Sequence, residues 1–175
     1  YLQAEDLVDT LKKMSKNKKY NQLVFYMEAC ESGSMFENLL PTDLNIFVTT
    51  ASNAQESSWG TYCPPQDSVN GKEIGSCLGD LYSVNWMEDS DTQAGLARTL
   101  DQQYTVVQKE TNKSHVQEFG SVGTFDASEP VSDFQAHKKS DVLASSLFSS
   151  SGAMGSSLTN ARDIPLVTAF YKYLR

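Results

Sequence analysis

The sequence lacks the features that mark a membrane-spanning or a nucleic-acid-binding protein. No stretch of the 175 residues approaches the run of about 18 apolar residues that a membrane-spanning helix needs. Basic residues are in deficit, since 14 Lys and Arg stand against 22 Asp and Glu, for a formal net charge of -8. A surface that binds phosphates needs an excess of positive charge. We therefore expect no membrane span, and we exclude nucleic acid as the main partner.

The start of the chain also lacks features of a complete precursor. The segment YLQAEDLVDTLKKM has no initiator Met and no apolar signal segment, and a helical pattern begins almost at once. This start predicts a piece of a longer protein. With 39% apolar and 21% charged residues, the composition suits one compact domain with its own core.

Cysteine is scarce, and the odd count of three suggests one bridged pair and one free thiol. Cys63 and Cys77 bracket the loop CPPQDSVNGKEIGSC, whose length a disulfide closes well, with a stabilisation of about 3 kcal/mol in the chain-entropy model. A disulfide implies an oxidising route, hence secretion or delivery to a vacuole or lysosome. A glycosylation sequon at Asn112 agrees with that route.

Hydrophobic patterns predict alternating helices and strands in the first 52 residues. Apolar residues at helical spacing predict an amphipathic helix over 4–16. Two apolar, β-prone runs predict buried strands at 23–27 and 45–52, and GSMFENLL between them predicts a short helix that ends before Pro41. This order indicates an α/β fold with a mostly parallel sheet flanked by helices. Farther on, apolar stripes predict core helices over 78–91 and about 93–111.

The segment YMEACESGSMF places Cys30 just past the carboxyl end of the first strand, an edge where open α/β sheets bind ligands. Two interpretations remain open, a small buried hydrophobe or a nucleophile. Residues 31–34 are expected to open a helix whose free backbone N–H groups activate a thiol and stabilise an oxyanion. Glu28 is expected on the same face as Cys30. A carboxylate there has little structural reason to exist.

Three blocks, YMEACESGSMF, TTASNAQESSWGTYC and CLGDLYSVNWMEDSD, closely resemble the legumains, asparaginyl endopeptidases also called vacuolar processing enzymes, with the plant-type disulfide loop. The similarity runs over roughly residues 1–111. It implies a caspase-like fold and a cysteine protease that cuts peptide bonds after asparagine, or after aspartate in acid. It implies no metal or organic cofactor.

The resemblance also implies roles for single residues. Cys30 matches the nucleophile, and its backbone N–H would form part of the oxyanion hole. An asparagine side chain offers one acceptor and two donors, which an arginine together with carboxylates satisfies. The pocket's arginine is expected upstream of this chain. The matching pocket residues in this chain are Glu28, Ser57, Ser58 and Asp80.

Outside the resemblance, Ser57 and Ser58 would be ordinary turn residues and Asp80 a charge at a helix N-terminus. The segment Trp59, Gly60 and Thr61 matches the leaving-group side of the cleft, where bulkier residues go with peptide ligase activity. Because Gly60 has no side chain to hinder water, we expect hydrolysis to dominate in acid, with ligation at most a side activity.

The catalytic base is missing from the pattern. A cysteine nucleophile usually needs a histidine. The two histidines, His115 and His137, lie in the weakly matched tail and are interpreted as surface residues. We therefore expect the catalytic His upstream and this chain alone to be inactive. The alternative is a non-catalytic homologue whose cleft binds peptides without cleaving them.

The predicted organisation has three parts. Residues 1–143 would be the C-terminal part of the catalytic domain, 144–162 a Ser/Gly-rich linker that contains the activation cleavage site at Asn160, and 163–175 the start of an activation peptide. The expected partners are Asn-containing substrates and the protein's own prodomain as an inhibitor that acid releases. Alternatively, Asn160 is a loop residue and 163–175 a surface helix of the same domain.

Overall fold

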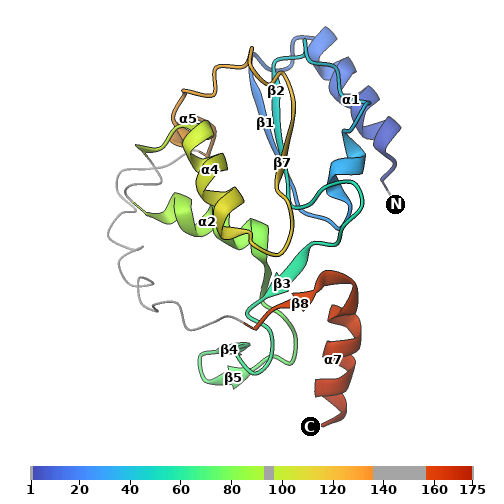
Figure 1. Cartoon of the computed structure of the whole chain (residues 1–175), viewed down its shortest axis with the longest axis vertical. Coiled ribbons are helices and arrows are strands. Elements are labelled where there is room, and N and C mark those ends of the chain that lie inside the picture. Colours follow the sequence, from blue (N-terminus) through green and yellow to red (C-terminus); the bar gives the residue numbers. More distant parts are fainter. Residues whose placement is uncertain (1, 93–96, 136–156, 175) are drawn as a thin grey trace.

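The computed structural model of the chain describes residues 2–92, 97–135 and 157–174, which form an α/β body with three small sheets (Figure 1). A central sheet lies between helices, and a second, smaller sheet lies below it. The helices are α1 (Ala4–Lys16), α2 (Leu81–Asp91), α4 (Leu100–Glu110), α5 (Val131–Gln135) and α7 (Ile164–Tyr173), with short 3-10 turns η1 (Ser32–Met35) and η2 (Ala161–Asp163). The strands are β1 (Leu23–Met27), β2 (Ile46–Thr50), β3 (Trp59–Thr61), β4 (Ser68–Val69), β5 (Lys72–Glu73), β6 (Gly79–Asp80), β7 (Gln117–Gly120) and β8 (Thr159–Asn160).

The central sheet has the order β1-β2-β7, with β1 parallel to β2 and β7 antiparallel to β2. Every residue of β2 is buried, because α1 and η1 cover one face and α2 and α4 the other (Figure 1). Ile46 and Val48 pack with α1, whereas Phe47 packs with Leu100 of α4. The α/β fold is confirmed. Among the described sheets only the central one is mixed and the other two are antiparallel, so parallel pairing is confined to β1 and β2.

The sequence patterns located most of these elements. The helix at 4–16 and the strand at 23–27 have the predicted bounds. The short helix predicted from GSMFENLL is only the 3-10 turn η1. The helix predicted over 78–91 begins at Leu81, because residues 79–80 pair with β3 as a strand. The stripe at about 93–111 corresponds to α4, which begins at Leu100 after a capping box made by Thr99.

The second sheet has the order β6-β3-β8, so β3 is paired on both edges. Its strand β8 comes from the far end of the chain and leads into α7, which lies beside β3 (Figure 1). Gly60 of β3 provides the room for this contact: a Cβ there would lie 2.7 Å from Ile164 Cδ1 of α7 and 3.1 Å from Cys77 Sγ. Absence of a side chain at Gly60 therefore lets α7 and the disulfide pack against β3.

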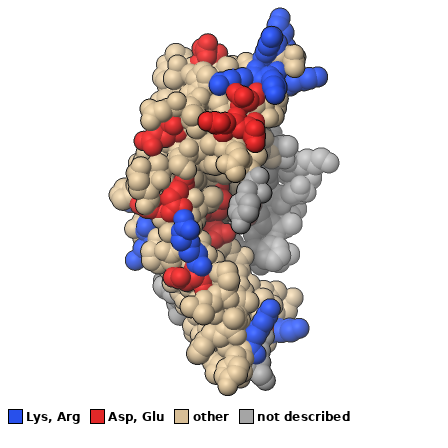
Figure 2. Space-filling model, turned by 90° about the vertical axis from the view of Figure 1, so that its right-hand side faces the viewer, with Lys and Arg blue, Asp and Glu red and all other residues tan. Residues whose placement is uncertain are grey.

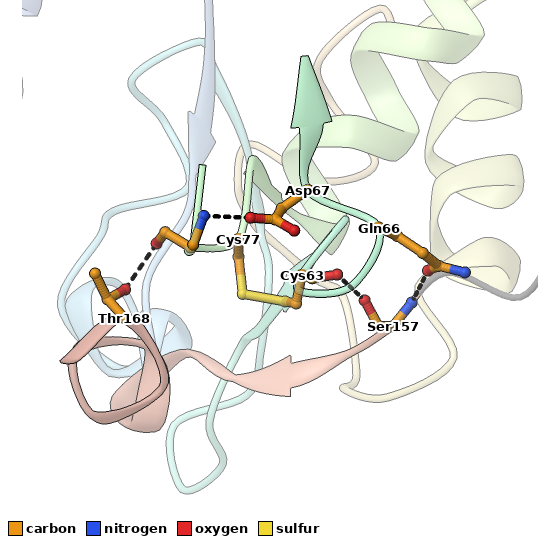
Figure 3. The surroundings of a disulfide bond; sticks show 8 residues. Cys63, Gln66, Asp67, Cys77, Ser157 and Thr168 are labelled. Carbon is orange, nitrogen blue, oxygen red and sulfur yellow. Dashed lines mark hydrogen bonds between the residues drawn. A yellow bond between two sulfur atoms is a disulfide. The ribbon is translucent and has the colours of Figure 1, made fainter. Parts of the chain in front are cut away.

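The predicted disulfide between Cys63 and Cys77 is present and closes the loop that carries the β4–β5 hairpin (Figure 3). Inside the loop, Asp67 is buried and accepts the backbone N–H of Gly75. The loop is also attached to the C-terminal segment, since Thr168 of α7 donates to Ser76 Oγ over 2.9 Å. Ser157 makes three further hydrogen bonds, two with Cys63 and one with Gln66.

Charge is distributed unevenly over the surface. Figure 2 shows Lys and Arg side chains gathered at the upper end of one face, with others near its middle and lower end, and acidic side chains over its upper and middle parts. Lys13 and Lys16 lie in the last turn of α1, where cations interact favourably with the helix dipole. Among the described residues, no helix is both long and apolar enough to cross a membrane.

Candidate active site

Cys30 lies three residues past the end of β1, at the edge of the sheet that the sequence indicated. It is a free, half-buried thiol. Its Sγ lies 3.7 Å from Oγ of Ser58, the buried residue that precedes β3. The next residue, Glu31, has a left-handed backbone with φ 51°, which turns the chain sharply after the thiol. The loop that follows β1 and the segment that precedes β3 thus meet at Cys30.

The backbone N–H groups after Cys30 are not free, contrary to the prediction. They bind the loop that follows β2, and η1 is a four-residue turn with no helix N-terminus to offer a ligand. The N–H of Cys30 itself has no hydrogen-bond partner among the described residues. The bonds of the turn are Glu31 N to the Glu56 carbonyl (2.8 Å), Ser32 N to Ser52 Oγ (3.1 Å) and Gly33 N to the Ser52 carbonyl (3.1 Å).

Glu28 has a structural role, contrary to the prediction from the sequence. Its Oε2 accepts both the backbone N–H and the hydroxyl of Ser83, each at 2.9 Å, and so satisfies a donor in the first turn of α2. Its Oε1 is buried without a hydrogen-bond partner in the described residues. Burial raises the pKa of Glu28 to about 7; the Ser83 bonds oppose this shift, and the charge of Asp80 adds to it.

The other predicted pocket residues lie on the elements around Glu28. Asp80 ends β6 opposite Gly60, begins α2, and has a pKa raised by burial. Ser57 is half-buried beside Ser58. In β3, Trp59 is half-buried, and Thr61 is buried, as is Gly60 beneath Ile164. The structure therefore brings Ser58 to Cys30 and Asp80 close enough to Glu28 for its charge to act on that carboxyl.

The far edge of β3 is occupied by residues 159–162, which pass beside Cys30. Asn160 lies opposite Trp59, and the N–H of Ala161 donates to the Ser58 carbonyl over 3.1 Å. Arg162 then forms an ion pair with Glu31. Asn160 is half-buried, and its Oδ1 accepts the Arg162 N–H at 3.0 Å, so it is held rather than free in a loop.

Two interactions at the site join residues that are far apart in the sequence and carry no local signal. One is the Arg162–Glu31 ion pair, and the other joins His115 to Glu56. His115 has no contact with Cys30, His137 lies outside the described residues, and Asn112 is exposed after α4. The bonds between Ser83 and Glu28 would follow from the sequence only if the start of α2 were placed correctly.

Comparison with known proteins gives consistent matches. Residues 1–137 match the Peptidase C13 family. The chain is 54% identical over 127 residues to a vacuolar-processing enzyme of Vicia sativa, 44% over 169 to the delta-isozyme of Arabidopsis thaliana and 53% over 121 to legumain of Canavalia ensiformis. These matches cover 70%, 94% and 69% of this chain but only 26%, 36% and 26% of the relatives. The chain thus spans between a quarter and just over a third of their length.

Proposed function

Because the chain belongs to the Peptidase C13 family, we propose that it forms part of a cysteine endopeptidase whose nucleophile is Cys30. The family assignment and the position of a free thiol at the edge of the central sheet support this proposal. The Cys30 thiolate attacks a substrate carbonyl, the peptide C–N bond breaks and the amine product leaves with a proton; water then cleaves the resulting thioester, which releases the acid product and regenerates the thiol. The thiol proton needs a base, which we expect from a part of the protein outside this sequence, since no described histidine contacts Cys30.

Specificity for asparagine is supported by one observation above all, the buried Glu28 Oε1 without a partner. An unpaired buried acceptor is costly, and the amide N–H₂ of a substrate asparagine would satisfy it. An ionised substrate aspartate offers no donor to Oε1, and it would be repelled wherever Glu28 and Asp80 are themselves ionised. A protonated aspartate carries a donor and no charge, which accounts for the proposed cleavage after aspartate in acid.

The C-terminal segment is proposed to inhibit the enzyme. Extended peptides commonly bind by adding a strand to an exposed sheet edge. Residues 159–162 take the free edge of β3 beside Cys30, where a substrate strand would pair, and Arg162 contacts Glu31 next to the thiol. Because protonation of carboxylates removes their charge, we propose that acid releases the segment.

A vacuole or lysosome, reached through the secretory pathway, is the proposed location. The relatives of this chain include proteins named vacuolar-processing enzymes, and the Cys63–Cys77 disulfide agrees with an oxidising route. The alternative function is a homologue that binds peptides without cleaving them. Turnover distinguishes the two, because both would bind an asparagine peptide.

The function is tested with the full-length natural protein and peptides that differ at one residue. We expect cleavage after asparagine to exceed cleavage after glutamine by at least about 100-fold, because the longer side chain misplaces the amide in the pocket. Mass spectrometry of the products, with an amine added to the same assay, measures ligation, and we expect mostly hydrolysis. Binding without cleavage would support the non-catalytic homologue. Equal cleavage after asparagine and glutamine would contradict the assignment of Glu28 to the substrate pocket.

Cleavage of the precursor after Asn160 is the proposed activation step. Because Asn160 pairs with Trp59, the segment must leave β3 before its peptide bond is presented for cleavage. We expect Asn160→Gln to slow maturation of the full-length precursor in acid by at least about tenfold, since the longer side chain fits poorly. Sequencing the new C-terminus measures this, with Thr159→Ser as the matched control. An Asn160→Gln precursor that matures at the parent's rate and to the same end would show that cleavage lies elsewhere.

A further inference from the structure

His115 is exposed, yet it holds a carboxylate that belongs to the loop of the site. Its Nδ1 lies 2.8 Å from Glu56 Oε2, and its backbone N–H donates to Glu56 Oε1 over 2.6 Å. The His115 side chain is 78% exposed and that of Glu56 only 23%, so the pair lies at the boundary of the protein interior. The preceding residue fixes the position of His115, because Ser114 Oγ donates to the carbonyl of Ala51 over 2.6 Å.

Glu56 in turn holds two segments that adjoin Cys30, the turn that follows it and the loop that carries Ser58. Its backbone carbonyl accepts the N–H of Glu31, the residue after the thiol, over 2.8 Å. Its Oε1 also accepts the N–H of Asn53 over 2.9 Å, which closes the loop on itself. The next two residues in the chain are Ser57 and Ser58, and Ser58 contacts Cys30.

The loop is packed closely against the turn after Cys30. A Cβ added at Gly33 would lie 2.9 Å from the backbone of Asn53, so no space separates the two segments. A displacement of Glu56 would therefore move the turn after the thiol as well as the pocket serines.

We propose that His115 is a positioning residue of the active site, which acts through Glu56 to hold the loop 53–58 and the backbone after Cys30 in place. The inference rests on the proposed function, and it gives a role to a histidine that the sequence analysis interpreted as a surface residue. His115 does not touch the reacting atoms in this arrangement.

The pair also gives the site a dependence on pH. Burial alone would raise the pKa of Glu56, but the N–H groups of Asn53 and His115 and the imidazolium charge outweigh it and lower that pKa. The contribution of Glu56 is thus present above its ordinary pKa and lost only as the pH falls through the lowered value. Glu56 therefore keeps its charge, and with it its hold on the loop, in moderate acid.

Other charges around Glu56 do not replace that of His115. The Glu31 side chain, whose backbone contacts Glu56, pairs with Arg162. Lys113, on the same loop as His115, forms no ion pair with Glu56 in the described ranges. Lys113→Gln is therefore a matched control, because it removes one positive charge from the loop without touching the pair.

The test combines hydrogen exchange and kinetics on the full-length protein. Exchange by mass spectrometry, normalised to intrinsic rates, follows peptides that cover residues 28–36 and 53–60. At about pH 5, where its lowered pKa keeps Glu56 charged, we expect His115→Gln to lower protection in both peptides about threefold, because the change removes the side-chain contact to Glu56 Oε2. Peptidase kcat/KM should fall by a similar factor at the same pH, and Lys113→Gln should match the wild type in both measurements.

Two further variants make the result decisive. In Glu56→Gln, the added His115→Gln change should have no further effect, as expected when the two residues act as a pair. His115→Lys keeps a cationic donor beside Glu56 and should restore part of the lost protection; it also serves if His115→Gln folds poorly. Equal exchange in His115→Gln and Lys113→Gln would overturn the proposal. If His115→Gln lowers protection as expected but the wild type cleaves no peptide, the proposed function is overturned and the positioning role stands.

Discussion

Replacement of Cys30 by alanine is expected to lower turnover of an asparagine peptide by roughly 10⁴-fold or more, because no other described group can form the acyl-enzyme. The fold should survive. The thiol is half-buried, and its Sγ makes only the 3.7 Å contact with Ser58 Oγ. Removing one sulfur from such a position costs on the order of 1 kcal/mol of the free energy of unfolding.

Steady-state kinetics and thermal unfolding of the full-length protein measure the two effects separately. Ser34→Ala, an exposed change in the same turn, is the matched control and should leave turnover near that of the parent. Residual turnover in Cys30→Ala within tenfold of the parent would disprove the assignment of the nucleophile. So would a disulfide at Cys30 in the mature protein, detected by mass spectrometry.

Replacement of Glu28 by glutamine is expected to lower kcat/KM for asparagine peptides by about 100-fold, because an N–H₂ group would face the substrate's own amide donors in place of an acceptor. The change also tests the titration of Glu28. The folded state holds the proton up to about pH 7, whereas the ordinary value for the unfolded chain is 4.5. The wild type should therefore lose stability as the pH rises from 4.5 towards 7, and Glu28→Gln should not.

Kinetics with peptides and thermal unfolding across this pH range provide the measurements. Ser83→Ala is a matched control, since it removes the hydroxyl bond to Oε2 and leaves the unpaired Oε1 unchanged. It should lower stability with little effect on the preference for asparagine. Undiminished asparagine cleavage by Glu28→Gln would show that Oε1 does not receive the substrate amide.

Local patterns in the sequence sufficed for the features that depend on neighbouring residues. The apolar stripe of α1 and the continuous run of β1 gave the right bounds, and the end of β1 gave the correct location for Cys30. The stripe of α1 reports its buried face, Val8 and Leu11, because its period follows the helix geometry. The predicted burial of β1 was wrong, since all five of its residues are half-buried at the edge of the central sheet. The length of the disulfide loop likewise sufficed to predict its closure.

Features that depend on distant residues could not be predicted in this way. The N–H groups after Cys30 looked free because their acceptors, on Ser52 and Glu56, lie in a loop about twenty residues away that has no periodic signal. The two-residue strand β8 is too short for any pattern, and 131 positions separate Arg162 from Glu31. Only tertiary packing brings these groups together.

Gly60 connects two properties of the enzyme that would otherwise vary independently. The position is expected to influence whether water or an amine receives the acyl group, and a Cβ added there would lie only 2.7 Å from Ile164 Cδ1 of α7. A side chain large enough to favour ligation at this position would therefore push α7 away from β3. Under the proposed function, a mutational route from protease to ligase through this residue would also loosen the segment proposed to inhibit the precursor, unless Ile164 became smaller at the same time. The choice of product and the timing of activation would then both depend on the side chain at residue 60.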